Sequence, residues 1–140
     1  MLKKTITYTD YDGNVRTEDF YFNLSKADVL EMELGVAGGM RQMLERIIQE
    51  KDNRRIVEAV KDFIARSYGV KSPDGKHFVK NKENLEAFMS TEAYTELLLE
   101  LLQDGDGASA FINGIFPQEL IQEAEQEQKK LAAVPSEQNN

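Results

Sequence analysis

The chain has 140 residues, 41% of them hydrophobic, which fits one domain with a core large enough to fold without disulfides or metals. The absence of cysteine excludes disulfides, thiolate zinc sites and cysteine nucleophiles. With 17 basic and 25 acidic residues the formal charge is -8, which disfavours direct binding to nucleic acid and to anionic membranes. Since no segment resembles a secretory signal or approaches the roughly 20 apolar residues of a membrane span, we expect a soluble protein that is not exported.

Two strands are predicted at the start of the chain, over residues 2–8 and 15–22. β-Branched and aromatic residues flank a turn rich in Asp, Asn and Gly there, which is the pattern of a β-hairpin. Phe20 and Phe22 share one face of the second strand, while Tyr21 points to the other. We expect the apolar face to cover helices.

The first helix is predicted directly after this hairpin. Ser25 and Asp28 have the spacing of a capping box, and the helix they begin should run through Leu34 and end at Gly35. The glycine pair at 38–39 then predicts a corner before the next element.

Two amphipathic helices are predicted in the middle of the chain, over residues 40–50 and 54–68. In each, apolar side chains recur at i, i+3, i+4 and i+7, and opposite charges lie four residues apart on the other side. The first stripe comprises Met40, Met43, Leu44, Ile47 and Ile48, and the second comprises Ile56, Val57, Val60, Phe63, Ile64 and Tyr68. Gly69 is expected to stop the second helix.

A small hairpin or ordered loop is predicted over residues 70–80, because Pro73-Asp74-Gly75 at its centre is a turn signature. Asn81 is expected to cap a short helix after it. Ser90 or Thr91 is expected to cap the helix that follows.

The helix that begins near residue 92 is crowded with apolar side chains. They are Tyr94, Leu97, Leu98, Leu99, Leu101 and Leu102. These are too many for one narrow stripe, so this helix is either central to the core or has a partner. An acidic glycine loop is predicted over residues 104–107, followed by a last core helix that presents Phe111 and Ile115 and ends near Pro117.

The predicted fold class is α+β and mainly α: an N-terminal β-hairpin followed by a compact bundle of about five to six helices. We assign residues 1–117 to one folded domain, with the hairpin at 2–22 and a helical body at 25–117. Residues 118–140 are rich in Glu and Gln and predict a polar helix that becomes a flexible tail.

Three features resemble chemical sites, and each has a simpler structural explanation. Asp10, Asp12 and Asn14 begin like a calcium loop, but the required glycine and glutamate are not at their positions, so a hairpin turn is predicted. The carboxylates at 104–106 could hold a cation weakly, yet Asp and Gly also end one helix and begin another. His77 is the only histidine and has no second ligand near it in sequence. We predict no catalytic residue, no metal site and no cofactor.

Two pieces of the chain carry a family resemblance: LSKADVLEME over residues 24–33 and FINGIFP over residues 111–117. An aromatic hairpin precedes the first and a leucine-rich helix precedes the second. Over about residues 4–117, this order of parts resembles the tail assembly chaperones of long-tailed, siphovirus-type bacteriophages and prophages of Gram-positive hosts. Neither piece is a catalytic signature.

The resemblance implies a non-enzymatic assembly factor. Such proteins bind the long, helical tape measure protein, keep its apolar faces from aggregating, and help tail tube protein polymerise around it. The resemblance therefore implies the tape measure protein and the tail tube protein as partners, self-association into many copies, action in the host cell cytoplasm, and absence from the mature virion. The family often makes a longer, frameshifted form, and we hypothesise one here because codons for Lys129 and Lys130 could form a slippery run of adenines.

The interface candidates follow from surplus apolar surface and not from contacts known in the family. They are Met40, Met43, Leu98, Leu99, Leu102, Phe111, Ile115 and Phe116. Burial in the protein's own core explains each of them equally well. A substitution such as Leu99→Glu separates the two explanations, because an interface position loses partner binding while the fold stays intact.

Two other functions are open to a chain of this composition. The main alternative is an acidic phage-encoded inhibitor that mimics nucleic acid, but here carboxylates alternate with Lys and Arg on predicted helix faces, whereas a mimic needs long uncompensated rows. The other is a small enzyme with a site built from residues distant in sequence, which a deep polar pocket with converging titratable groups would favour.

Overall fold

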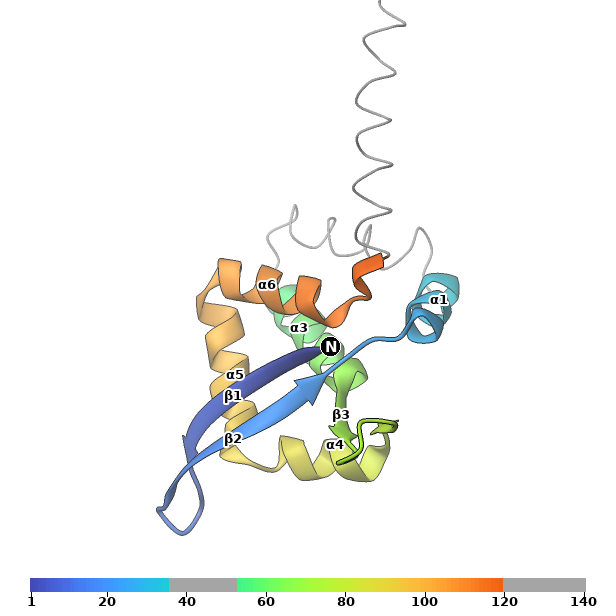
Figure 1. Ribbon diagram of the computed structural model, residues 1–140. Coiled ribbons are helices and arrows are strands. Elements are labelled where there is room, and N and C mark those ends of the chain that lie inside the picture. Colours follow the sequence, from blue (N-terminus) through green and yellow to red (C-terminus); the bar gives the residue numbers. More distant parts are fainter. Residues whose placement is uncertain (36–52, 120–140) are drawn as a thin grey trace, which may run out of the picture.

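The computed structural model describes residues 1–35 and 53–119, and it confirms the α+β fold class (Figure 1). Within those residues there are five helices and one antiparallel sheet of four strands in the order β1-β2-β3-β4. The predicted corner at 38–39, the predicted helix at 40–50 and the predicted tail from residue 120 lie outside the described residues.

The N-terminal hairpin is formed as predicted by β1 (Leu2–Thr9) and β2 (Val15–Phe22), paired from Leu2↔Phe22 to Thr9↔Val15. Its turn needs Gly13, whose φ of 86° lies in the left-handed region. The side chains of Ile6, Tyr8 and Phe22 are buried on the inner face. The outer face carries mostly exposed threonines and charged residues, so only one face of the sheet faces the core.

The predicted small hairpin is also present, as β3 (Tyr68–Lys71) and β4 (Phe78–Val79), with Gly75 in the left-handed region at its turn (φ 77°). The sequence did not predict that β3 would join the first hairpin, at Tyr21↔Gly69 and Phe22↔Tyr68. The prediction of Tyr68 as helical was therefore wrong. Its backbone pairs with β2 because α3 (Asn53–Ser67) ends one residue earlier.

The other helices are α1 (Lys26–Gly35), α4 (Lys82–Met89), α5 (Glu92–Gln103) and α6 (Gly105–Ile115). The predicted capping box of α1 is confirmed, since the Asp28 amide donates to Ser25 Oγ at 3.1 Å and the Ser25 amide donates to Asp28 Oδ2 at 2.8 Å. The predicted cap of α4 is confirmed as well, because Asn81 Oδ1 accepts the amide of Asn84.

Two predicted helix starts need correction. Thr91 stands at the N-cap of α5, but its hydroxyl donates back to the Phe88 carbonyl at 2.7 Å and caps nothing. The predicted loop at 104–107 is wrong in extent, because α6 begins at Gly105 and Asp104 alone separates it from α5. Asp104 ends one helix and caps the next by accepting the Asp106 amide, so the turn needs no further residues.

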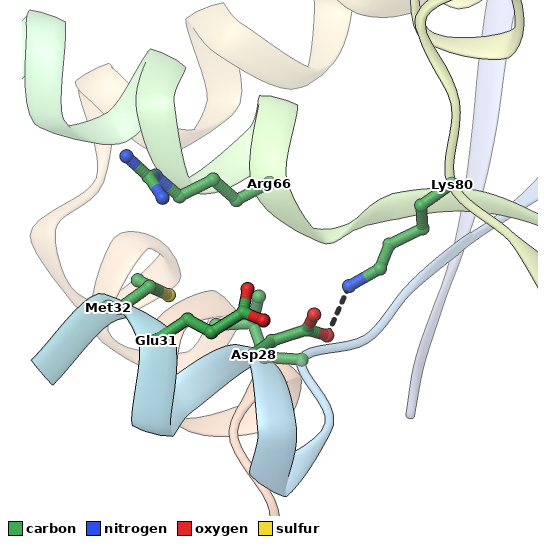
Figure 2. A pocket seen from close by; sticks show the side chains of 6 residues that line it. Asp28, Glu31, Met32, Arg66 and Lys80 are labelled. Atoms are coloured by element: carbon green, nitrogen blue, oxygen red, sulfur yellow. Dashed lines mark hydrogen bonds and ion pairs between the residues drawn. The ribbon is translucent and has the colours of Figure 1, made fainter. Parts of the chain in front are cut away.

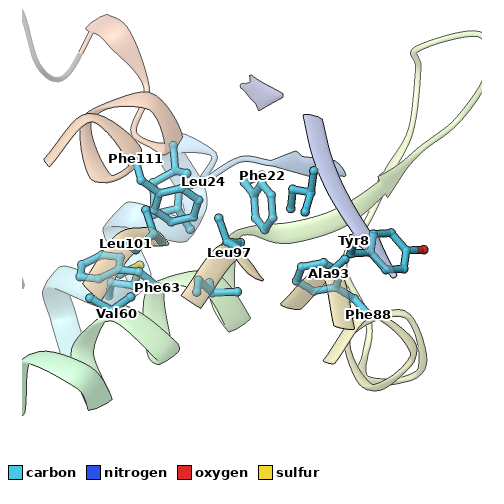
Figure 3. Packing of buried hydrophobic residues seen from close by; sticks show 14 residues of the cluster. Tyr8, Phe22, Leu24, Val60, Phe63, Phe88, Ala93, Leu97, Leu101 and Phe111 are labelled. Carbon is cyan, nitrogen blue, oxygen red and sulfur yellow. The ribbon is translucent and has the colours of Figure 1, made fainter. Parts of the chain in front are cut away.

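The core lies between the inner face of the sheet and the helices (Figure 3). Phe22 is fully buried at the centre of the core. The centroid of its ring lies 5.3 Å from that of Phe111 and 5.9 Å from that of Phe88, in edge-to-face contact with both. α5 contributes Ala93, Leu97 and Leu101 to the same cluster. Residues far apart in sequence thus meet around one aromatic ring.

Candidate interaction surface

α5 has two apolar sides, and only one of them is buried. Ala93, Leu97 and Leu101 recur every four residues and are 0 to 3% exposed. Leu99 and Leu102 lie off this stripe and remain 47% and 38% exposed. The crowding of leucine predicted from the sequence is therefore divided between a core stripe and an outer surface.

Leu98 lies between these two sides, partly buried against the core. Because Leu98 and Leu102 are four residues apart and Leu99 and Leu102 are three apart, the three side chains are neighbours on one side of the helix. We call this surface the α5 leucine face (Leu98, Leu99 and Leu102). It is the part of the predicted interface that the structure brings together on the outside.

The other candidates lie elsewhere. Phe111 and Ile115, 3% and 0% exposed, belong to the core. Phe116 is partly buried and packs on Phe63 with ring centroids 6.0 Å apart. Met40 and Met43 lie outside the described residues. Only the α5 leucine face therefore supplies candidates that a partner could cover without opening the fold.

The charges that α5 and α6 themselves carry near this face have one sign. Between Glu92 and Phe116 the chain carries five carboxylates and no basic residue. Among the described residues, Glu100 of this segment forms an ion pair with Lys4 of β1 at 3.0 Å. An apolar face with an acidic surround fits a partner whose apolar stripe is flanked by Lys or Arg.

A cavity of about 140 Å³ lies between α1 and the body of the fold (Figure 2). Its lining combines apolar Leu24 and Met32 with Asp28, Glu31, Arg66 and Lys80. The acidic side chains come from α1 and face the basic ones across it.

Three of these four charged side chains already have partners. Lys80 Nζ pairs with Asp28 and donates to the Asn23 carbonyl at 3.1 Å, and Arg66 pairs with Asp62 at 2.8 Å. Partial burial acts to raise the pKa of Asp28, but hydrogen bonds from Lys80 and Ser25 outweigh it and hold that pKa below its ordinary value. The polar residues around the cavity therefore hold α1 against the rest of the fold. Among the described residues, no Ser, Thr or Cys side chain lines the cavity.

The turn carboxylates have structural partners, as the sequence predicted. Asp10 accepts the amides of Asp12 and Asn14, and Arg16 Nε lies 2.6 Å from its Oδ2. The hydrogen bond from Arg16 holds the pKa of Asp10 below its ordinary value. Within the described residues no group of three or more His, Cys, Asp or Glu side chains is arranged to hold a metal ion.

The two pieces that carry the family resemblance meet in the fold. The Leu24 amide, at the start of the first piece, donates to the Ile115 carbonyl, near the end of the second, at 2.8 Å. Lys26 also forms an ion pair with Glu119 just beyond α6. The beginning of α1 and the end of α6 thus form one junction.

A family model described as "Phage tail assembly chaperone" matches residues 1–140. The chain belongs to this family. No curated protein and no solved structure matches it.

Tail assembly chaperones are non-enzymatic. No helix among residues 1–35 and 53–119 combines the length and apolar character of a membrane span. Leu30 of α1 is 60% exposed and was not predicted as an interface candidate. The signal was available, since Val29 and Met32 mark the packed side of α1 and Leu30 lies off it.

Proposed function

We propose that this tail assembly chaperone binds the tape measure protein, keeps it soluble, and promotes polymerisation of the tail tube protein around it. The α5 leucine face is the observation that carries the proposal. Family membership supports a role in assembly over the inhibitor alternative. Seven described carboxylates in ion pairs also argue against a nucleic-acid mimic, namely Asp10, Glu18, Asp28, Asp62, Glu86, Glu100 and Glu119.

The partner that fits is an amphipathic helix. Helices lie with an apolar stripe on an apolar surface, and covering half-exposed leucines contributes about 1 kcal/mol each. The carboxylates of α5 favour a stripe flanked by Lys or Arg and disfavour acidic segments. One such helix covers little area, so a long tape measure protein requires many copies of the chaperone.

Co-expression with the tape measure protein tests this, with size-exclusion chromatography and light scattering as the readout. The wild-type chain should keep the tape measure protein soluble and co-elute with it in many copies. Leu99→Glu should abolish co-elution, because it places a charge at the centre of the apolar contact.

The matched control is Val79→Glu, which places the same charge at a similarly exposed apolar residue of β4. It should retain the complex, and both variants should melt like the wild type. If Leu99→Glu still solubilises the tape measure protein, the leucine face is not the interface. An insoluble tape measure protein beside the wild-type chain would contradict the proposal itself.

The narrower parts of the proposal rest on the resemblance. We place this protein in the cytoplasm of a Gram-positive host and outside the mature virion, and we propose self-association and a longer, frameshifted form. Lys129 and Lys130, which motivate the frameshift, lie outside the described residues. Reading the nucleotides of those codons and of the overlapping frame tests it, and absence of both signals would contradict it.

A further inference from the structure

β1 lies at the edge of the sheet, because the strand order is β1-β2-β3-β4. Among the described strands it forms the longer of the two outer edges, with eight residues against the two of β4. A free edge presents N–H and C=O groups that another strand can pair with.

The register shows which groups face this edge. The Asp10 amide donates to the Asn14 carbonyl across the hairpin at 2.8 Å. Since backbone direction alternates along an antiparallel strand, the N–H and C=O groups of Lys3, Thr5, Thr7 and Thr9 point away from β2. Among residues 1–35 and 53–119 no hydrogen bond to these backbone groups is present.

We propose that this edge pairs with the β1 edge of a second copy of the chain, antiparallel and about a two-fold axis, with Thr5 opposite Thr7 of the second copy. This deepens the self-association in the proposed function and rests on it. The pairing continues both sheets into one sheet of eight strands. It uses all four outward-facing residues of each edge.

Two features favour this register. Both copies keep the same face of the sheet toward solvent only when residues 3, 5, 7 and 9 of one copy stand opposite residues of the same set in the other. This requirement places Lys3 opposite Thr9 of the second copy. Threonine pairs across strands are favourable, and no lysine opposes a lysine. Shifting the register toward the start of the strand would bring the two Lys3 side chains together.

The distribution of charge also favours a second copy as the occupant. The strand begins with Lys3 and ends at a turn that carries Asp12, and both lie outside the ion pairs that Lys4 forms with Glu100 and Asp10 forms with Arg16. Antiparallel pairing brings the basic start of each copy next to the acidic turn of the other, so the edge is complementary to itself. This local match acts against the repulsion between two chains of charge -8.

The test compares the full-length wild-type chain with Thr7→Pro and Thr17→Pro by sedimentation velocity over a concentration series. The two positions are cross-strand partners on the outer face, and either substitution removes the same hydroxyl contact of 3.0 Å. Proline at 7 removes an N–H from the β1 edge, whereas proline at 17 removes one from the opposite edge of β2, beyond its pairing with β3.

Thr7→Pro should raise the dissociation constant of the dimer by about tenfold or more, since each dimer loses a hydrogen-bond donor from both copies. Thr17→Pro should leave it unchanged. A wild-type chain that stays monomeric at all concentrations would overturn the proposal. Equal weakening by both substitutions would overturn it too, because it would indicate head-to-tail pairing of β1 with β2.

A charge variant covers the case in which proline unfolds the hairpin. Lys3→Glu places an acid next to the acidic turn of the second copy and should weaken the dimer, while Lys76→Glu, in the exposed β3–β4 turn, should not. Equal dimerisation of both variants would count against the edge. Because these measurements use the isolated protein, their failure leaves tape measure co-elution to decide the proposed function separately.

Discussion

α5 and α1 are held to the fold by different forces. α5 buries Ala93, Leu97 and Leu101 against the sheet and its neighbouring helices. α1 buries Met32, and polar contacts hold its first turn: the capping box with Ser25 and the ion pair between Asp28 and Lys80. The attachment of α5 should therefore depend on how well the core is filled. The attachment of α1 should depend on the protonation and placement of a few polar groups.

Leu97→Ala should have the largest effect, because Leu97 is fully buried. A cavity at such a position costs about 3 kcal/mol of unfolding free energy. Leu99→Ala, on the other side of the same helix, should change it by less than about 0.5 kcal/mol. Denaturant unfolding followed by circular dichroism measures both. Equal losses would mean that the two sides of α5 do not differ as described.

Gly69→Ala should cause the next largest loss of unfolding free energy. It also affects α1, because Gly69 lies next to Lys80, which pairs with Asp28 of α1. A Cβ at this position would lie 2.7 Å from the Phe78 ring and 2.9 Å from Lys80 Cγ, so it would push on the residue that holds Asp28. Overpacking of this kind costs about 2 kcal/mol.

Gly105→Ala is the matched control for that substitution. A Cβ at Gly105, at the start of α6, meets nothing within 4 Å. The control should be neutral or slightly stabilising, because alanine is a better helix former than glycine. If Gly69→Ala is as stable as the control, β4 can shift at little cost in free energy, and the contact between Lys80 and Asp28 contributes little to stability.

Local signals were sufficient for much of this fold. Asp, Asn and Gly in the turns predicted both hairpins, and the polar caps predicted where α1 and α4 begin, since these bonds form between residues close in sequence. The union of the two hairpins could not be predicted in this way. It depends on Tyr21 and Phe22 pairing with Gly69 and Tyr68, which are distant in sequence, and not on a pattern along either strand.

The candidate site was predictable only in part, for a related reason. The sequence marked α5 as too apolar for one stripe, and the α5 leucine face confirms a surplus outside the core. Periodicity alone could not separate Leu97 from Leu99, because leucines surround the helix and several stripes can be drawn. It also left Phe111 open between core and interface, since its burial depends on Phe22 reaching it from the distant hairpin.

Asp28→Asn should have the smallest of the three effects and tests the polar side of the comparison. The amide keeps the shape of the side chain but removes the charge that pairs with Lys80, which should cost about 1 kcal/mol at neutral pH. The measurement is unfolding free energy as a function of pH, with Asp12→Asn in the exposed hairpin turn as the control.

The sign of the pH dependence follows from the lowered pKa of Asp28. The folded state binds the proton less readily than the unfolded state, so the stabilisation is complete above the ordinary value of 3.8 and is lost as the pH falls through the lower folded pKa. The gap between wild type and Asp28→Asn should therefore be constant near neutrality and close in acid. A gap that persists in acid would mean that Asp28 holds α1 by its hydrogen bonds to Ser25 and not by its charge, which would make the attachment of α1 as insensitive to pH as that of α5.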